Sequence, residues 1–239
     1  MHDRPETFGL PAVADYKNDH TAKTVSKESL KAVQMDVLKN PAIWILGLSS
    51  ASMYVARYGV NNWAILFLQE GKGYSLVAAG SVLSAYPIMG LFGAAVSGLV
   101  SDKLFNSKRN MPALIFGLME IGALTVFLLT PAGNTVIDTA AMAVFGFALG
   151  ALLCYLGGLM AVDISSKRAA GAAMGLIGMF SYLGAAFQDY VSGFLINANK
   201  IVENGVTTYN FDSMKYFWIG ASVLSLLLAA SVWKVKAKD

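Results

Sequence analysis

Long apolar runs alternate with short polar breaks from Pro41 onward, after an opening stretch that is mostly polar. Each run has about 20 residues or more, the length that an α-helix needs to cross a bilayer. Barrel strands would be about 10 residues long and would alternate apolar with polar positions, which these runs do not. The pattern therefore predicts six membrane-spanning helices, at about 42–69, 76–100, 111–131, 137–161, 169–197 and 214–233.

The first 40 residues have a different character, with six Lys/Arg and six Asp/Glu. They lack the basic stretch followed by an apolar run that marks a signal peptide. We interpret 1–40 as a solvated linker with one short helix at 26–38. Residues 41–239 form the predicted transmembrane domain, an all-α bundle of six helices with a short C-terminal tail.

Composition agrees with a membrane protein and excludes several other classes. The chain is 56% hydrophobic and 14% charged, whereas soluble domains are about 25% charged. Its mean hydropathy is +0.54. A net charge of +3 and a single cysteine, Cys154, argue against a nucleic-acid binder and against a disulfide scaffold.

Lys and Arg are distributed unequally between the two sets of polar segments. Residues 1–40, the breaks at 101–110 and 163–168, and the C-terminal tail hold fourteen of them, whereas the opposite breaks hold three. Because cytoplasmic segments carry the excess of Lys/Arg, both termini are expected in the cytoplasm. The expected location is the plasma (inner) membrane.

Arg57 is the sharpest candidate for chemistry. It lies about 18–20 Å from either end of its predicted helix, too deep for its side chain to reach the interface. Ser50, Tyr54 and Asn61 share its helical face, which indicates a polar, water-lined pathway. Guanidinium matches phosphate or carboxylate through paired N–H donors. The alternative is a structural ion pair with Asp189 or Glu120.

Two further intramembrane groups are carboxyls, which makes each a functional candidate. Asp189 lies on the same face of its helix as Tyr182, seven residues earlier. It could pair with Arg57, carry a proton, or form a structural hydrogen bond near the helix end. Glu120 is near the middle of the third helix, and a packed or protonated Glu explains it equally well.

The break after the second helix begins with Gly98 and continues to Asp102 and Lys103. Gly, three residues and then Asp followed by a cation resembles the loop signature of the major facilitator superfamily. This resemblance implies that Gly98 permits close packing where the chain leaves the membrane and that Asp102 pairs across helix ends to stabilise one conformation. A basic loop explains the cations alone but neither Gly98 nor Asp102. Glycines at four-residue spacing, such as Gly146 and Gly150, predict close helix packing.

Four stretches together resemble one family. They are Arg4–Pro11 with Tyr16–Asp19, Tyr54–Gly59 with Trp63, Gly98–Lys103, and Lys167–Gly171 with Phe180–Gly184. They are similar to the central loop, the seventh helix, the loop after the eighth helix and the eleventh helix of the organophosphate:phosphate antiporters of the major facilitator superfamily. The chain thus resembles the C-terminal half of a twelve-helix glycerol-3-phosphate or hexose-phosphate transporter.

This resemblance implies a site. Arg57 would bind the substrate phosphate together with an Arg from the family's first helix, and Tyr54 and Tyr182 match tyrosines that line the central cavity. Asn61, from the polar face of the same helix as Arg57, is the fourth candidate for substrate binding. The implied partners are an organic phosphate, inorganic phosphate, the bilayer and an N-terminal six-helix half. A second copy of this chain is the less favoured alternative to that half. No nucleic acid, cofactor or metal is expected. Pro87 and Gly150 stand where family members carry a cavity Glu and a cavity Tyr, so the substrate stays open.

Three functions remain open at this point. The first is exchange of an organic phosphate for inorganic phosphate by alternating access. The second is a membrane sensor that reports external sugar phosphate to a histidine kinase, and the third is an inert fragment of a split transporter gene. An enzyme is not expected, because the two histidines, His2 and His20, lie in the linker, and the sequence shows no metal-ligand cluster or nucleophile–base pair.

Overall fold

The computed structural model describes residues 30–106, 109–166, 169–203 and 206–233, together with Gly9 and Val235. The chain divides into two units, Met1–Met35 and Asp36–Asp239. The stretches 4–8 and 16–19 that carry the linker resemblance, and Lys167 and Arg168, lie outside the described residues. The account below concerns the second unit.

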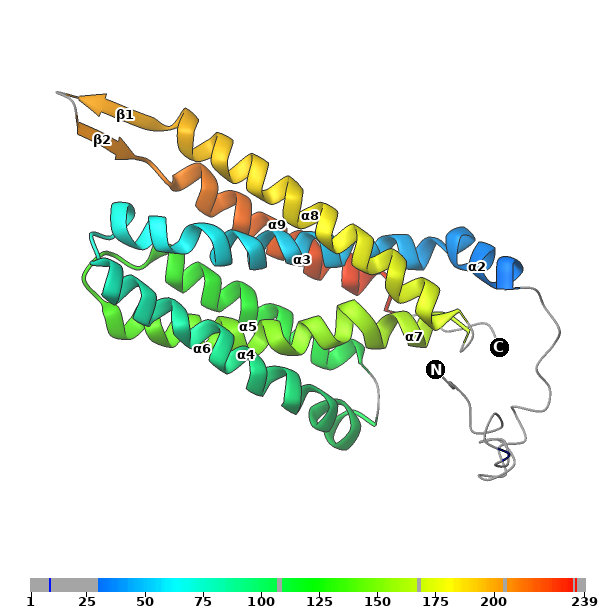
Figure 1. The fold of residues 1–239 in the computed structure, drawn as a ribbon. Helices are drawn as coiled ribbons and strands as arrows, with labels where there is room; N and C mark the ends of the chain where they lie inside the picture. Colours follow the sequence, from blue (N-terminus) through cyan, green and yellow to red (C-terminus); the bar gives the residue numbers. More distant parts are fainter. Residues whose placement is uncertain are drawn as a thin grey trace. The chain divides into compact units, whose positions relative to one another are not determined.

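Long helices dominate the described residues, as the apolar runs predict (Figure 1). In chain order the elements are α2 (Leu30–Lys39), α3 (Pro41–Leu66), the π-helical turn η3 (Phe67–Gly71), α4 (Leu76–Leu104), α5 (Asn110–Leu129), α6 (Thr135–Cys154), the π-helical turn η4 (Tyr155–Leu159), α7 (Met160–Ile164), α8 (Ala170–Ala198), strands β1 (Lys200–Glu203) and β2 (Val206–Tyr209), and α9 (Asp212–Ser231).

Within the part of the chain that the structure describes, five helices are long and apolar enough to cross a membrane: α4, α5, the continuous helix Thr135–Ile164, α8 and α9. Helix α3 has 26 residues and is the most polar of the long helices, because it carries Arg57, Asn61 and Asn62. Its start is defined by the Asn40 side chain, which accepts a hydrogen bond from the Ala42 amide at 3.1 Å, and by Pro41 in the first turn.

The long helices of the described residues form two groups, α3 with α8 and α9, and α6 with α4 and α5, which lie side by side (Figure 1). Helix α3 packs on α8 and α9, and α6 packs on α4 and α5. In chain order, the long helices thus form two sets, α3 to α5 and α6 to α9, and the first helix of each set packs on the last two long helices of the other set. Both of these first helices, α3 and α6, run into a π-helical turn. This repeat is structural, since the sequence shows no clear repeat among the helices.

Glycines set the closest helix contacts. A side chain at Gly146 or Gly150 on α6 would collide with the backbone carbonyl of Tyr86 or Gly90 on α4. The small-residue spacing therefore predicted this contact correctly. Gly98 differs from the expectation, because nothing lies within 4 Å of the position of a side chain there.

Two boundaries differ from the sequence prediction. The break expected at 197–213 contains an antiparallel hairpin, in which Lys200 pairs with Tyr209 and Glu203 with Val206. Helix α4 runs through Pro87 to Leu104, four residues beyond its expected end. Below, the "hairpin end" of the bundle is the end with β1, β2 and residues 72–75, and the "α2 end" is the end where α2 meets α3 (Figure 1).

Candidate functional site

Helices α3 and α8 approach each other closely near the middle of the bundle. A side chain at Gly184 would collide with the backbone carbonyl of Ala51, so only glycine allows this spacing. Ser50 is buried and forms a 2.8 Å hydrogen bond with Ser181 of α8. Ser50 therefore joins the two helices and does not line a water-filled face, in contrast to the expectation from the polar stripe.

Arg57 lies one to two turns further along α3 and is half-buried. Its guanidinium carbon is 5.0 Å from the ring centre of Tyr54 and 5.3 Å from that of Tyr58, distances typical of cation–π contacts. The side chain of Tyr86, on α4, faces the same guanidinium. Among the described residues, no carboxylate forms an ion pair with Arg57.

Three tyrosines form a cluster beside this guanidinium on the α3–α8 side, and two of them, Tyr54 and Tyr58, contact it. Tyr54 and Tyr58 stack with ring centres 5.7 Å apart, and Tyr182 packs edge-on against them at 5.8 and 6.5 Å. Tyr182 is 63% exposed, so the cluster opens onto the surface of the bundle. The structure thus places three of the sequence candidates, Arg57, Tyr54 and Tyr182, in one cluster with Tyr58, and Tyr86 faces the guanidinium from α4.

Tyr58 and Tyr86 were not among the sequence candidates. Tyr58 is four residues from Tyr54 and beside Arg57, so helical spacing contained a signal for it. Tyr86 had no such signal, because its place near Arg57 depends on how α4 packs against α3.

Asp189 does not pair with Arg57 or with another cation of the described residues. Its Oδ1 accepts hydrogen bonds from Asn62 Nδ2 at 2.9 Å and from Trp63 Nε1 at 3.3 Å, and its Oδ2 accepts from Asn62 Nδ2 at 3.1 Å. Asn61 in turn donates to Asn62 Oδ1 at 2.8 Å. The ion pair considered from sequence is wrong, because Asp189 lies nearer the hairpin end than the guanidinium does.

Glu120 is also unpaired with Arg57. It is 2% exposed, and its Oε1 accepts a 2.8 Å hydrogen bond from Ser222 of α9. The carboxyl is packed among α5 and α9 side chains, and no cation of the described residues contacts it. The structure therefore separates Glu120 from the tyrosine cluster.

The motif expected in a loop lies in a helix. Gly98, Asp102 and Lys103 belong to the last two turns of α4, and the latter two are exposed. A contact missed from sequence joins neighbouring segments at this end: Arg109, before α5, pairs with Asp163 of α7 and donates to the Leu159 carbonyl at 3.0 Å. Arg109 therefore joins the start of α5 to η4 and α7 through these two contacts.

A buried ion pair at the hairpin end was also missed. Lys72 Nζ lies 2.6 Å from Asp138 Oδ1 and donates to the Phe127 carbonyl at 2.7 Å, with side chains 3% and 0% exposed. Tyr74 Oη donates to Asp138 Oδ2 at 2.8 Å. Burial lowers the pKa of Lys72 from 10.5, against the opposing effect of Asp138. Burial and the Asp138 bond raise the pKa of Tyr74 to about 12.

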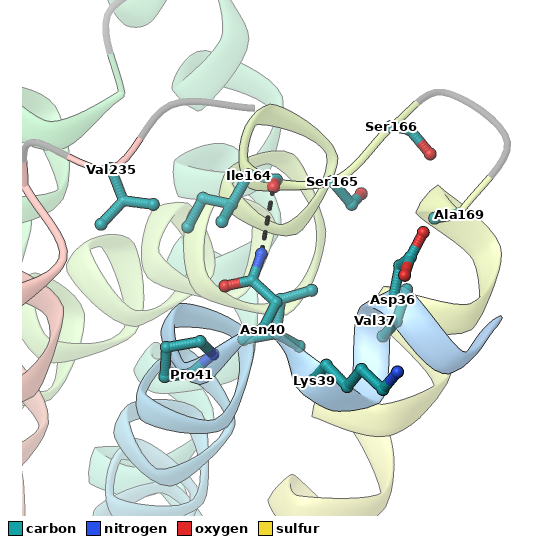
Figure 2. A pocket seen from close by; sticks show the side chains of 11 residues that line it. Asp36, Val37, Lys39, Asn40, Pro41, Ile164, Ser165, Ser166, Ala169 and Val235 are labelled. Atoms are coloured by element: carbon teal, nitrogen blue, oxygen red, sulfur yellow. Dashed lines mark hydrogen bonds between the residues drawn. The ribbon is translucent and has the colours of Figure 1, made fainter. Parts of the chain in front are cut away.

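A cavity of about 600 Å³ lies at the α2 end, away from Arg57 (Figure 2). Asp36, Lys39 and Asn40 line one side, and Ser165 and Ser166 line the other. Asn40 Nδ2 donates across it to the Ile164 carbonyl at 3.4 Å. Neither Arg57 nor any tyrosine of its cluster lines this cavity. Among the described residues, no group of three His, Cys, Asp or Glu could hold a metal ion.

Comparison with known proteins identifies the family. The sequence profile of the Major Facilitator Superfamily matches residues 8–188, which is more than half of the chain. The chain belongs to the Major Facilitator Superfamily. The half-bundle predicted from the sequence agrees with this family and with the chain's coverage of its relatives.

Among the relatives of this chain, two are named as transporters and one is named as a sensor. A glycerol-3-phosphate transporter of Bacillus subtilis is 31% identical, over 98% of this chain and 51% of that protein. The membrane sensor protein UhpC of Salmonella typhimurium is 36% identical, over 80% and 44%. The hexose-6-phosphate:phosphate antiporter of Escherichia coli is 28% identical, over 95% and 50%. The chain spans about half the length of these relatives, and none of the three is named as an enzyme.

Proposed function

We propose that this chain supplies the C-terminal half of the substrate site of a membrane exchanger that swaps an organic phosphate for inorganic phosphate by alternating access. The supporting observation is the state of Arg57: a half-buried guanidinium, framed by tyrosines, with no carboxylate partner among the described residues. A charge at this depth is costly unless a ligand or cavity compensates for it. A phosphate can accept two parallel N–H bonds from such a guanidinium.

The names of the relatives support this chemistry. Glycerol-3-phosphate and hexose phosphate share a phosphate monoester, and one relative is named as an antiporter. The relatives are about twice as long as this chain, so we propose an N-terminal six-helix half as its partner, with a second copy of the chain as the less favoured partner. We propose that this partner covers the face on which Tyr182 is exposed.

The excess of Lys and Arg in residues 1–40, 101–110, 163–168 and the C-terminal tail supports a cytoplasmic position for these segments and for both termini in the inner membrane. Gly98, Asp102 and Lys103 would then lie at the cytoplasmic surface. There the exposed Asp102 and Lys103 would stabilise one of the two conformations of the exchanger.

Arg57→Lys tests the proposal because it keeps the charge but loses the planar pair of donors. We measure phosphate exchange in membrane vesicles from cells that express the chain in its native gene context. We expect it to fall at least about 100-fold, because the lost binding free energy corresponds to two tenfold steps in affinity. Lys215→Arg is the matched control, since Lys215 lies outside the Arg57 cluster, where it pairs with Asp212 and lies 5.6 Å from the centre of the Phe67 ring. Near-normal exchange by Arg57→Lys would contradict the proposal.

The second candidate function is a sensor of external organic phosphate. One observation favours it: the relative with 36% identity is named as a membrane sensor. The same Arg57 site would then bind ligand, and the output would be a contact with another membrane protein. Phosphate binding that depends on Arg57, without exchange across the membrane, would favour the sensor over the exchanger.

A further inference from the structure

An apolar groove of about 540 Å³ lies between α8 and α9, with α3 as its floor. Both helices pack on α3 but contact each other little, which leaves a gap between them. Ala51 and Val55 belong to the floor, while Leu183 of α8 and Leu224 of α9 line the sides and are exposed. The groove is therefore open along its side to the surroundings of the bundle.

Aromatic rings limit the length of this groove. Towards the hairpin end, Phe187 of α8 and Phe217 of α9 meet edge-on with ring centres 6.2 Å apart and bridge the two helices. Towards the α2 end, Phe180 packs against Trp44 with ring centres 5.4 Å apart. A helix with its side chains is about 10–12 Å across, so a second helix would have to displace the Phe187–Phe217 bridge. A single flexible hydrocarbon chain fits beside it.

The groove lies at the depth of the hydrocarbon core and is lined accordingly. Leu48 and Val55 are about 10 and 21 Å along α3 from its start, and the hydrocarbon core is about 30 Å thick. Ser52 and Tyr216 are the polar side chains of the lining, and the Ser52 hydroxyl already donates to the Leu48 carbonyl at 2.9 Å. No charged side chain of the described residues lines the groove, so an apolar occupant fits it.

The groove and the Arg57 cluster lie on opposite sides of α3 and α8. Arg57 is two residues after Val55, and Tyr182 is two residues after Phe180, so each is about 200° around its helix from a groove residue. A partner that completes the Arg57 face therefore leaves the groove to the bilayer. Because the chain is a multi-pass membrane protein, lipid lies next to the open side of the groove.

We propose that this groove is a binding site for one acyl chain of a membrane phospholipid, which lies along α3 between α8 and α9. The hydrophobic effect does not drive this binding, because the chain comes from lipid that is as apolar as the groove. The gain comes from van der Waals contacts with three helices, which are weak one by one and substantial together. The bound chain supports α8 from the side opposite Tyr182.

Gly220 provides the test, because it lines the groove and nothing lies within 4 Å of the position of a side chain there. Gly220→Leu therefore fills the groove without a collision, and Gly220→Ala fills it in part. Gly122→Leu is the matched control. It makes the same change at a glycine of α5 that also has open space but does not line the groove.

Cells that express the chain in its native gene context are grown with a palmitic acid analogue that carries a diazirine, so that their phospholipids become photoreactive. After illumination of membrane vesicles, mass spectrometry measures the labelled fraction of Leu183 and Leu224. Leu118, an exposed residue of α5 outside the groove, is the reference. In wild type we expect the groove leucines to carry at least about threefold more label than Leu118, the effect of several added van der Waals contacts.

Gly220→Leu should lower the label on the groove leucines to the wild-type level of Leu118, whereas Gly122→Leu should leave it unchanged. A labelled fraction does not depend on the amount of protein, and Gly220→Ala, with an intermediate decrease, serves if Gly220→Leu does not assemble. Equal labelling of groove and reference in wild type would overturn the site, as would full labelling in both Gly220 variants. Less label in the groove than at Leu118 would show that another helix covers it and would overturn the site as well.

Discussion

Two cations of this bundle lie against aromatic rings, and they differ in whether a carboxylate pairs with them. Lys72 Nζ lies 5.6 and 5.1 Å from the ring centres of Phe67 and Phe127, and Asp138 and the Phe127 carbonyl accept hydrogen bonds from it. Arg57 lies against Tyr54 and Tyr58 at similar distances but has no carboxylate among the described residues. One charge is neutralised within the fold, and the other is left for something else to neutralise.

The difference teaches how to separate a structural cation from a ligand-binding one. Burial of a charge is costly unless it is paired, so a fully buried Lys72 needs Asp138 for the fold to form. A half-buried Arg57 keeps contact with solvent and can remain unpaired until an anion arrives. The loss of Lys72 should therefore reduce stability, whereas the loss of Arg57 should reduce binding.

Lys72→Met should give the largest effect on stability. It leaves Asp138 buried without its cation, which costs about 3–5 kcal/mol when a buried pair is broken. We expect a strongly lowered melting midpoint of the detergent-solubilised protein, or little protein in the membrane. Arg57→Met, the matched change at the other cation, should alter the midpoint little. Equal midpoints for wild type and Lys72→Met would break the comparison.

A double variant separates the pair from the packing of the Lys72 side chain. Lys72→Met combined with Asp138→Asn removes both charges, so the uncompensated carboxylate is gone. We expect it to recover more than half of the midpoint lost by Lys72→Met alone. If the double variant is as unstable as the single one, the fold depends on the hydrogen bonds of Lys72 and Asp138 rather than on their charges.

Asn61→Asp should make Arg57 resemble Lys72. It places a carboxylate one turn away on the same face, where it can interact with the guanidinium. We expect inorganic phosphate to bind about tenfold more weakly, equivalent to about 1.4 kcal/mol, with an unchanged melting midpoint. Competition of phosphate against labelled phosphate in vesicles measures this. Asn197→Asp, on the exposed outer part of α8, is the control, and equal weakening there would indicate a general charge effect.

The sequence was sufficient for features that depend on local pattern. Hydropathy located the long helices, small-residue spacing predicted the contact of Gly146 and Gly150 with α4, and helical periodicity placed Tyr54 beside Arg57. The motif stretches also indicated the family correctly. Each of these signals lies within one helix or one short stretch, so no knowledge of tertiary packing was needed.

Features that depend on packing could not be predicted in the same way. Lys72 and Asp138 are 66 residues apart and both lie near breaks between helices, where charges are ordinarily solvated. The partners of Asp189 depend on the height of α8 relative to α3, and the contact of Tyr86 with Arg57 depends on the position of α4. The hairpin of β1 and β2 is too short to produce a clear periodicity.

Tyr74→Phe should give the smallest effect on stability. It tests how much the Tyr74 hydroxyl contributes to the buried pair of Lys72 and Asp138. The phenol donates to Asp138, and its loss should cost about 1 kcal/mol at neutral pH. Burial raises the pKa of Tyr74 from 10.0 to about 12, so the folded protein holds this proton to higher pH than the unfolded chain. Its stabilisation is complete below pH 10 and is lost as the pH rises towards about 12. Melting midpoints should therefore fall over this range in wild type and in the control Tyr216→Phe, and fall less in Tyr74→Phe. An identical fall in all three would show that the proton on Tyr74 contributes nothing to the buried pair.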